Sequence, residues 1–500
     1  MSIPEYKPTP LEAIPLIRED LGKAFKSGKA RPVAFRKDQL LSLAYLVKDN
    51  LPRLKDALAA DLGRPHLETD ILESGPTLGE IKQAFSNVAK WAKTESAPFS
   101  LNYFAMKPKI RKEPKGVVLV IVPFNYPILL SLSPLAGAIA AGNACVIKPS
   151  ELCPAFSALL AELVPQYLDN DLYRVVNGAI PETTKLLELQ WDHILFTGSG
   201  RIARIVLAAA AKTLSPVSTE LGGKSPCIID PGCDLKTAAR RIMWGKTANA
   251  GQTCTAPDYV IVPKSFQDTF VKACVDVLKE FYPKGAENSD SYSRVISTAH
   301  TERIKSMIEN TKGKIAYGGA SNVEKKFCEP TIVTDVQMDD STMTGEIFGP
   351  VLPVIPVETL DDAIDLVNSR DHPLALYVFT KSETLKQKVF NNTQSGGALA
   401  NEVVLQVTAD GIPFGGIGPS GSGSHTGKYT FDMFTHLHPT LDNPSWLDYV
   451  MGGRFPPFTV CSHKTSAMFF DVDIRIAAIH QAGDVHDHTV IPCAQAARWE

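Results

Sequence analysis

The chain has 500 residues, of which 44% are hydrophobic and 21% are charged, and its formal net charge is −3. This is the composition of an ordinary globular protein, long enough for roughly two to four domains. It excludes a strongly basic surface for nucleic acid, and nine cysteines without a CxxC pair favour a reducing compartment over a disulfide scaffold.

The first hundred residues predict helices. Apolar residues recur at helical spacing within residues 10–60 and again over about 75–93. Residues 104–116 alternate charged and apolar side chains, which favours an exposed strand or hairpin arm. No basic region followed by an apolar run opens the chain, so we expect no secretory signal and a cytoplasmic protein, with peripheral membrane association left open.

An uncharged stretch between Lys115 and Lys148 is long enough to span a bilayer. Three prolines and Asn125 interrupt it, however, and its apolar runs are short. We therefore predict a buried strand, a loop, a helix with Pro127 near its start and a second buried strand, as in a parallel sheet covered on both faces. No transmembrane anchor is expected here.

From residue 117 onward, predicted strands and helices alternate, which is typical of βαβ units. Helices are expected near 154–167, 181–189, 235–249 and 265–280. The alternation restarts after residues 220–230, so the sequence predicts two α/β units. The last forty residues differ in kind. His480, His486 and His488 are residue types that can bind a metal, but an irregular extension is the favoured interpretation, and we expect no metal.

Two turns have the residues of a dinucleotide site. In FTGSG (196–200), Gly198 and Ser199 follow a strand and open a helix, whose N-terminal N–H groups would face an anion. In KPSE, Lys148 ends a strand and Glu151 follows, where an acid binds ribose hydroxyls. Each motif alone is equally consistent with an ordinary solvated turn.

Three further residues have the chemistry of a catalytic site. Asn125 in PFNYP either caps a helix or donates to an oxyanion. Glu220 in ELGGKSP is either a surface residue or a desolvated base. Cys254 in GQTCTAPDYV is either a small core residue or a nucleophile.

Seven motifs together settle these alternatives by resemblance. PFNYP, KPSE, FTGSG, ELGGKSP, GQTC, EIFGP (346–350) and the run from NEVV to PFGGIGPSGSG (401–423) stand in the order and spacing of the aldehyde dehydrogenase superfamily. The chain most closely resembles the class 3, fatty-aldehyde-type branch, over roughly residues 15–460. By this resemblance Cys254 is the nucleophile, Asn125 the oxyanion donor and Glu220 the general base.

The same resemblance implies the remaining site. Lys148 and Glu151 would hold the adenosine ribose, Gly198 and Ser199 the pyrophosphate, and Glu346 and Phe348 the nicotinamide end. Asn401 and Phe414 would form the substrate-side wall. The cofactor would be NAD, with NADP also possible, and the substrate a medium- or long-chain aliphatic or aromatic aldehyde that is oxidised to an acid.

Fold and assembly follow from the resemblance as well. The fold would be α/β, with a Rossmann-type NAD-binding domain, an α/β catalytic domain, a small β oligomerisation arm and a homodimeric assembly. The ranges would be 1–95 and 117–221 for NAD binding, 222–423 for catalysis, 96–116 and about 424–445 for the arm, and 446–500 for the extension. Two alternatives remain open: an enzyme that passes its acyl group to coenzyme A, and a non-catalytic NAD-binding protein on this fold.

Overall fold

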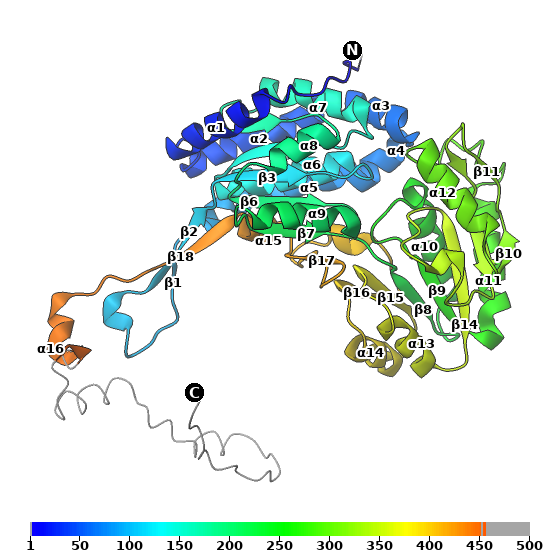
Figure 1. Cartoon of the computed structure of the whole chain (residues 1–500). Helices are drawn as coiled ribbons and strands as arrows, with labels where there is room; N and C mark the ends of the chain where they lie inside the picture. Colours follow the sequence, from blue (N-terminus) through cyan, green and yellow to red (C-terminus); the bar gives the residue numbers. More distant parts are fainter. Residues whose placement is uncertain (1–2, 452–453, 457–500) are drawn as a thin grey trace, which may run out of the picture. The chain divides into compact units, whose positions relative to one another are not determined.

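The computed structural model describes residues 3–451 and 454–456 (Figure 1). By packing, these residues divide into two compact units, one made of residues up to 93 together with 112–437, the other of 94–111 and the described residues from 438 onward. The predicted extension lies mostly outside the described residues, as do its histidines.

The first sheet of the larger unit has six strands in the order β17-β7-β6-β3-β4-β5. Its five longer strands run parallel, and the short strand β17 pairs antiparallel with β7. The strands are β3 (Val117–Ile121), β4 (Ala144–Lys148), β5 (Tyr173–Val175), β6 (His193–Thr197), β7 (Val217–Glu220) and β17 (Gly421–Ser422).

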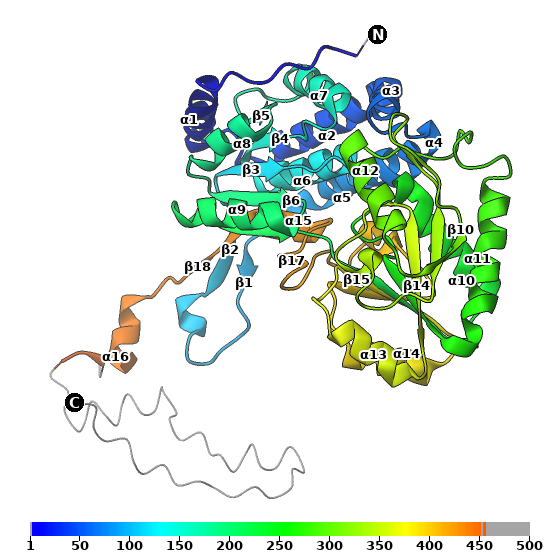
Figure 2. The same ribbon diagram turned by 45° about the vertical axis from the view of Figure 1, so that its right-hand side comes forward.

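Helices cover both faces of this sheet, as the uncharged stretch predicted (Figure 2). Helix α6, which begins at Pro127, is buried along almost its whole length. One layer contains α2 (Val33–Asp49), α5 (Gly75–Trp91), α6 (Pro127–Ala141) and α15 (Lys428–Met433), and the other contains α1 (Ala13–Lys26), α8 (Ile180–Leu187) and α9 (Gly200–Ala211). Helices α3 (Leu51–Leu62) and α7 (Pro154–Tyr167) pack against each other. No helix in the described part of the chain has the length and apolarity needed to cross a membrane.

The second sheet has seven strands in the order β10-β13-β14-β9-β8-β15-β16. Successive residues alternate between two cores: Ile228 packs on one face, while Cys227 and Ile229 pack on the other. The strands are β8 (Pro226–Ile229), β9 (Tyr259–Pro263), β10 (Lys314–Tyr317), β13 (Thr331–Thr334), β14 (Val351–Val357), β15 (Ala375–Phe379) and β16 (Gly397–Ala400). Its helices are α10 (Leu235–Thr247), α11 (Gln267–Phe281), α12 (Thr298–Glu309), α13 (Leu360–Asn368) and α14 (Glu383–Asn392).

A small sheet of order β1-β2-β18 includes the predicted exposed strand, β2 (Lys109–Pro114), with β1 (Glu95–Ser96) and β18 (Thr435–Thr440). The arm was predicted over residues 96–116 and about 424–445, and these ranges stay a prediction. Residues 424–434 belong to the larger unit, because α15 packs on α6 and α5, and β18 begins only at Thr435. The short β17 likewise joins the first sheet rather than the second.

Candidate active site

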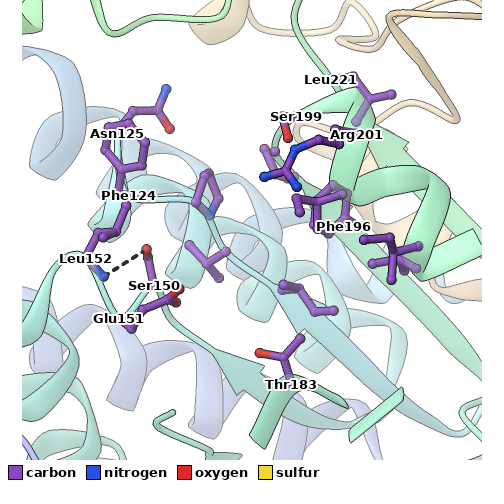
Figure 3. A pocket seen from close by; sticks show the side chains of 18 of the residues that line it. Phe124, Asn125, Ser150, Glu151, Leu152, Thr183, Phe196, Ser199, Arg201 and Leu221 are labelled. Atoms are coloured by element: carbon purple, nitrogen blue, oxygen red, sulfur yellow. Dashed lines mark hydrogen bonds between the residues drawn. The ribbon is translucent and has the colours of Figure 1, made fainter. Parts of the chain in front are cut away.

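A cavity of about 810 Å³ opens at the carboxyl ends of β3, β4 and β6. This is the edge of a parallel sheet where ligands bind in doubly wound folds. All but two of the predicted site residues line it: Asn125, Lys148, Glu151, Gly198, Ser199, Glu220, Cys254, Glu346 and Phe348. In Figure 3, Phe124 and Asn125 face Phe196, Ser199 and Arg201 across the opening.

Cys254 follows a short loop with unusual backbone geometry. Asn249, Ala250 and Gly251 have positive φ angles of 51°, 52° and 75°. A Cβ atom at Gly251 would lie 2.3 Å from the carbonyl oxygen of Gly349, so only glycine fits there. This tight turn brings Cys254 to the cavity after the helical residues 235–247.

Asn125 is held by its backbone, which leaves its side chain available. Its carbonyl oxygen accepts a hydrogen bond from Asn249 Nδ2 at 2.9 Å and another from Arg64 Nη2 at 2.5 Å. Tyr126 and Thr253 bond through their hydroxyls at 2.5 Å, so the Asn125 and Cys254 loops are joined twice.

A helix-capping role for Asn125 finds no support in the geometry. The residue before α6 is Tyr126, and its side chain makes no cap hydrogen bond. The first N–H groups of the helix, those of Ile128 and Leu129, donate instead to Glu73 Oε2 at 2.7 and 3.1 Å. Glu73 is in turn paired with Arg64, and both side chains are fully buried.

Glu220 ends β7 and is only 4% exposed. Its Oε1 lies 3.7 Å from His425 Nε2, and its Oε2 has no hydrogen-bond partner among the described residues. Burial raises the pKa of Glu220 above the ordinary carboxyl range, although His425 opposes the shift. A base with a raised pKa and a free oxygen suits proton abstraction near neutral pH.

Burial also raises the pKa of the Cys254 thiol, and the nearby carboxyl groups of Glu346 and Glu220 raise it further. The thiol is therefore protonated in the cavity as it stands. A base must take its proton, or a bound cationic group must stabilise the thiolate, before the sulfur can act as a nucleophile.

Glu346 lies against Gly222, where a Cβ atom would come within 2.2 Å of its Oε1. Burial, and the charge of Asp258, raise the pKa of Glu346 to about 8. Lys224 fixes the segment that carries Glu346, since its Nζ donates to Asp258 Oδ2, at 2.5 Å, and to the carbonyl oxygens of Thr342 and Gly345. Asp258 Oδ1 also accepts the Ile347 N–H at 3.0 Å.

The other half of the cavity fits a dinucleotide. Lys148 Nζ donates to Glu151 Oε2 at 2.8 Å, so the predicted ribose-binding pair is in contact. Gly198 leaves no room for a side chain, because a Cβ atom there would lie 2.7 Å from the Phe196 ring. Ser199 precedes the first turn of α9, and Ser199, Arg201 and Ile202 line the same opening, at the helix end that favours anions. The donors and the close backbone approach together suit a pyrophosphate.

The two remaining predicted residues do not line the cavity. Asn401 bonds both side-chain atoms to the backbone of Thr380, at 2.9 Å each, and so fixes a loop. Phe414 is buried with its ring edge-on to His425, at 5.3 Å between centroids. It stands behind Glu220 rather than in the cavity wall.

The sequence reasoning missed several residues of the site. Arg64, Glu73 and His425 act through contacts that span the chain, and no local pattern marks them. The cavity also includes Thr183, Leu187, Arg201 and His300, which lie on helices with no chemical motif.

Comparison with known proteins agrees with this geometry. Residues 13–439 match the model of the aldehyde dehydrogenase family. This chain belongs to that family. Aldehyde dehydrogenase family 3 member A2 of Mus musculus is 45% identical over 87% of this chain and 90% of its own length. The dimeric NADP-preferring aldehyde dehydrogenase of Canis lupus familiaris is 43% identical over 87% of this chain and 95% of its own.

Solved structures give the same result for the fold. The substrate-bound state of AldH from Staphylococcus aureus superposes with a TM-score of 0.88 at 38% identity, covering 91% of this chain and 99% of that one. An NAD⁺ complex of an aldehyde dehydrogenase from Bacillus cereus superposes with a TM-score of 0.78 at 28% identity, covering 86% of this chain and 89% of that one. The chain is thus an NAD(P)-dependent aldehyde dehydrogenase with the α/β fold of its family, as predicted, and it oxidises aldehydes.

Proposed function

We propose that this aldehyde dehydrogenase converts medium- or long-chain aliphatic or aromatic aldehydes to free carboxylic acids, with Cys254 as nucleophile and Glu220 as general base. The observation that carries the proposal is the shared cavity: Cys254, Asn125 and Glu220 line it together with the residues suited to a dinucleotide. The coenzyme A-acylating alternative does not need a buried carboxylate base at this place.

Each residue has a distinct step. The Cys254 thiol releases its proton to solvent, since a bound nicotinamide cation would stabilise the thiolate. The sulfur then bonds to the aldehyde carbon, and the Asn125 side-chain amide and the Cys254 backbone N–H donate to the oxyanion that forms. Removal of one such donor typically costs about a hundredfold to a thousandfold in rate. The bound nicotinamide supplies the hydride acceptor. The resulting thioester on Cys254 is then hydrolysed by a water molecule that gives its proton to Glu220.

The cofactor residues are assigned in the same way. Lys148 and Glu151 bind the adenosine ribose, Gly198 and Ser199 the pyrophosphate, and Glu346 and Phe348 position the nicotinamide end. Glu151 favours NAD, because an acid beside the ribose 2′-hydroxyl repels a 2′-phosphate. We propose NAD as the preferred cofactor and NADP as a second one.

We also propose a homodimer. A relative is named as dimeric, and the smaller unit exposes large apolar side chains: Phe99 is 79% exposed, Leu101 74% and Tyr449 92%. Exposed apolar groups of this kind mark protein interfaces. The cytoplasmic location stays a prediction from the sequence.

The test follows reduced-nicotinamide absorbance with hexanal, a long-chain aldehyde and benzaldehyde, using NAD or NADP, with and without coenzyme A. Wild type is compared with Cys254→Ala and with Cys274→Ala, which removes a buried thiol of the α11 core. We expect turnover in wild type and Cys274→Ala, none in Cys254→Ala, no response to coenzyme A, and free acid as product. A requirement for coenzyme A would contradict the hydrolytic assignment, and full activity of Cys254→Ala would contradict the nucleophile.

A further inference from the structure

A second cavity, of about 200 Å³, is lined by His425, the neighbour of the proposed general base Glu220. Its lining contains Glu80, Asp410 and His425 together with Ser133, whose buried hydroxyl oxygen has no partner among the described residues. A cavity of this size with several polar groups is roomy enough to hold water. The function proposed above does not use it.

One ion pair joins the two cavities. Glu220 lines the first, His425 lines the second, and Glu220 Oε1 and His425 Nε2 are 3.7 Å apart. Both side chains are buried, and the ring of Phe414 covers the imidazole from the side. On the side of the first cavity, Glu220 also interacts electrostatically with the Cys254 thiol.

Two acidic residues, Glu80 and Asp410, line the second cavity together with His425. The Glu80 carboxyl on α5 interacts electrostatically with His425 and raises its pKa. Glu80 Oε2 also accepts a hydrogen bond from the Gly427 N–H at 2.6 Å. Asp410 is exposed, interacts with Glu80 and accepts a hydrogen bond from Gln83. Burial alone would favour a neutral imidazole, but Glu220 and Glu80 outweigh it and raise the pKa of His425. Glu220 and Glu80 thus both favour the protonated form of the imidazole.

Hydrolysis of the thioester leaves a proton on Glu220, and this proton must reach solvent. As water attacks the thioester, its oxygen bonds to the acyl carbon, the C–S bond breaks, and Cys254 leaves with the sulfur electron pair. The water proton is taken by Glu220, which must release it before it can activate another water. The acyl group on Cys254 and a bound dinucleotide would occupy the first cavity during this step, so we place the exit of the proton on the other side of Glu220.

We propose that His425 is a positioning and proton-relay residue, which passes the Glu220 proton into the second cavity and on to Glu80, Asp410 and solvent. The inference rests on the proposed function of Glu220. His425 gives one proton to the second cavity and takes one from Glu220, so its own charge is restored. The 3.7 Å separation is slightly beyond hydrogen-bond distance, and catalytic hydrogen bonds are often this long before substrate binds.

The test is stopped-flow measurement of reduced nicotinamide in His425→Gln and Glu80→Gln, since glutamine can donate to or accept from its neighbours but cannot relay a proton at these positions. Asp432→Asn, on the exposed Lys428–Asp432 pair of α15, is the matched control. We expect a full first-turnover burst in all proteins. Steady-state turnover should fall at least about tenfold in His425→Gln and less in Glu80→Gln, and stay unchanged in Asp432→Asn.

The pH profile separates a relay from a structural role. His425 opposes the raised pKa of Glu220, so its removal raises that pKa further and moves the acid limb of kcat to higher pH. Unchanged steady-state turnover in His425→Gln, an unmoved acid limb, or a slowed burst would each overturn the relay. Failure of the proposed function looks different, because wild type itself would then lack either the burst or the acid product.

Discussion

At the scale of single residues, the site is defined by three buried acidic groups whose proton affinities differ. Burial raises the pKa of Glu220, of Glu346 and of the Cys254 thiol. Glu220 must be ionised to act as a base, whereas Glu346 is neutral below its pKa of about 8. The order in which these groups lose protons therefore sets the pH range in which the enzyme works.

The first prediction concerns the Cys254 thiol. Above pH 8 Glu346 carries a negative charge that disfavours the thiolate, so Glu346→Gln should lower the thiol pKa. The pH dependence of alkylation by iodoacetamide measures this directly, and its midpoint should move to lower pH. Glu358→Gln, on an exposed ion pair of the second sheet, should leave the midpoint in place. A midpoint that stays put or rises in Glu346→Gln would contradict the described electrostatics.

At the scale of elements, much of the fold followed from periodicity and composition. The helix over 154–167 was predicted at the bounds that α7 has, and the buried strand–helix–strand over 117–148 is β3, α6 and β4. The helices α12, α13 and α14 and the short strands β8 and β16 were not predicted. Helix α13 has apolar residues at helical spacing but is only nine residues long, and β8 and β16 have four residues each. Charged exposed faces and short strands carry weak patterns.

The site was predictable only where a motif carries its chemistry in consecutive residues. GQTC and ELGGKSP identified Cys254 and Glu220 as candidates, while Arg64, Glu73 and His425 reach the site from distant segments. The Cys254 loop shows the same limit. Its positive φ angles at Asn249 and Ala250 depend on contacts with Asn125 and Gln252, which no local propensity encodes.

The second prediction concerns the element that holds Asn125. Arg64 and Glu73 form a fully buried ion pair, and Glu73 also accepts hydrogen bonds from the first N–H groups of α6. Glu73→Gln removes the nearer carboxylate from Arg64 but leaves Glu68, whose Oε1 lies 3.8 Å from Arg64 Nε. Breaking a buried pair typically costs about 3–5 kcal/mol, and Glu68 offsets part of this cost. The free energy of unfolding should drop by this order in chemical denaturation, and kcat should fall because Asn125 loses its support.

A matched control is available on the surface. Asp276→Asn breaks the exposed Lys272–Asp276 pair of α11, whose loss should change the free energy of unfolding by less than about 1 kcal/mol. Equal effects of Glu73→Gln and Asp276→Asn would show that the buried pair does not stabilise the α6 N-terminus.

At the scale of the whole molecule, both described cavities are lined by residues of the larger unit, and the smaller unit contributes no residue to either of them. Its exposed apolar side chains instead support the proposed dimer. The third prediction is therefore that Leu101→Asp or Tyr449→Asp lowers the molar mass measured by sedimentation toward that of a single chain. Leu214→Asp, at an exposed leucine of the larger unit, should leave the molar mass unchanged. A wild-type protein that sediments as a monomer would contradict the proposal outright.

The central claim is that acyl transfer to Cys254 precedes hydrolysis by Glu220, and intact-protein mass spectrometry of Glu220→Gln tests it most directly. After mixing with hexanal and NAD and acid quenching, we predict one equivalent of reduced nicotinamide and one hexanoyl group per chain, mapped to the peptide that contains Cys254. Wild type should carry less of this adduct than Glu220→Gln at steady state, because its thioester is hydrolysed. Reduced nicotinamide formed without an adduct, or an adduct on another cysteine, would contradict the account.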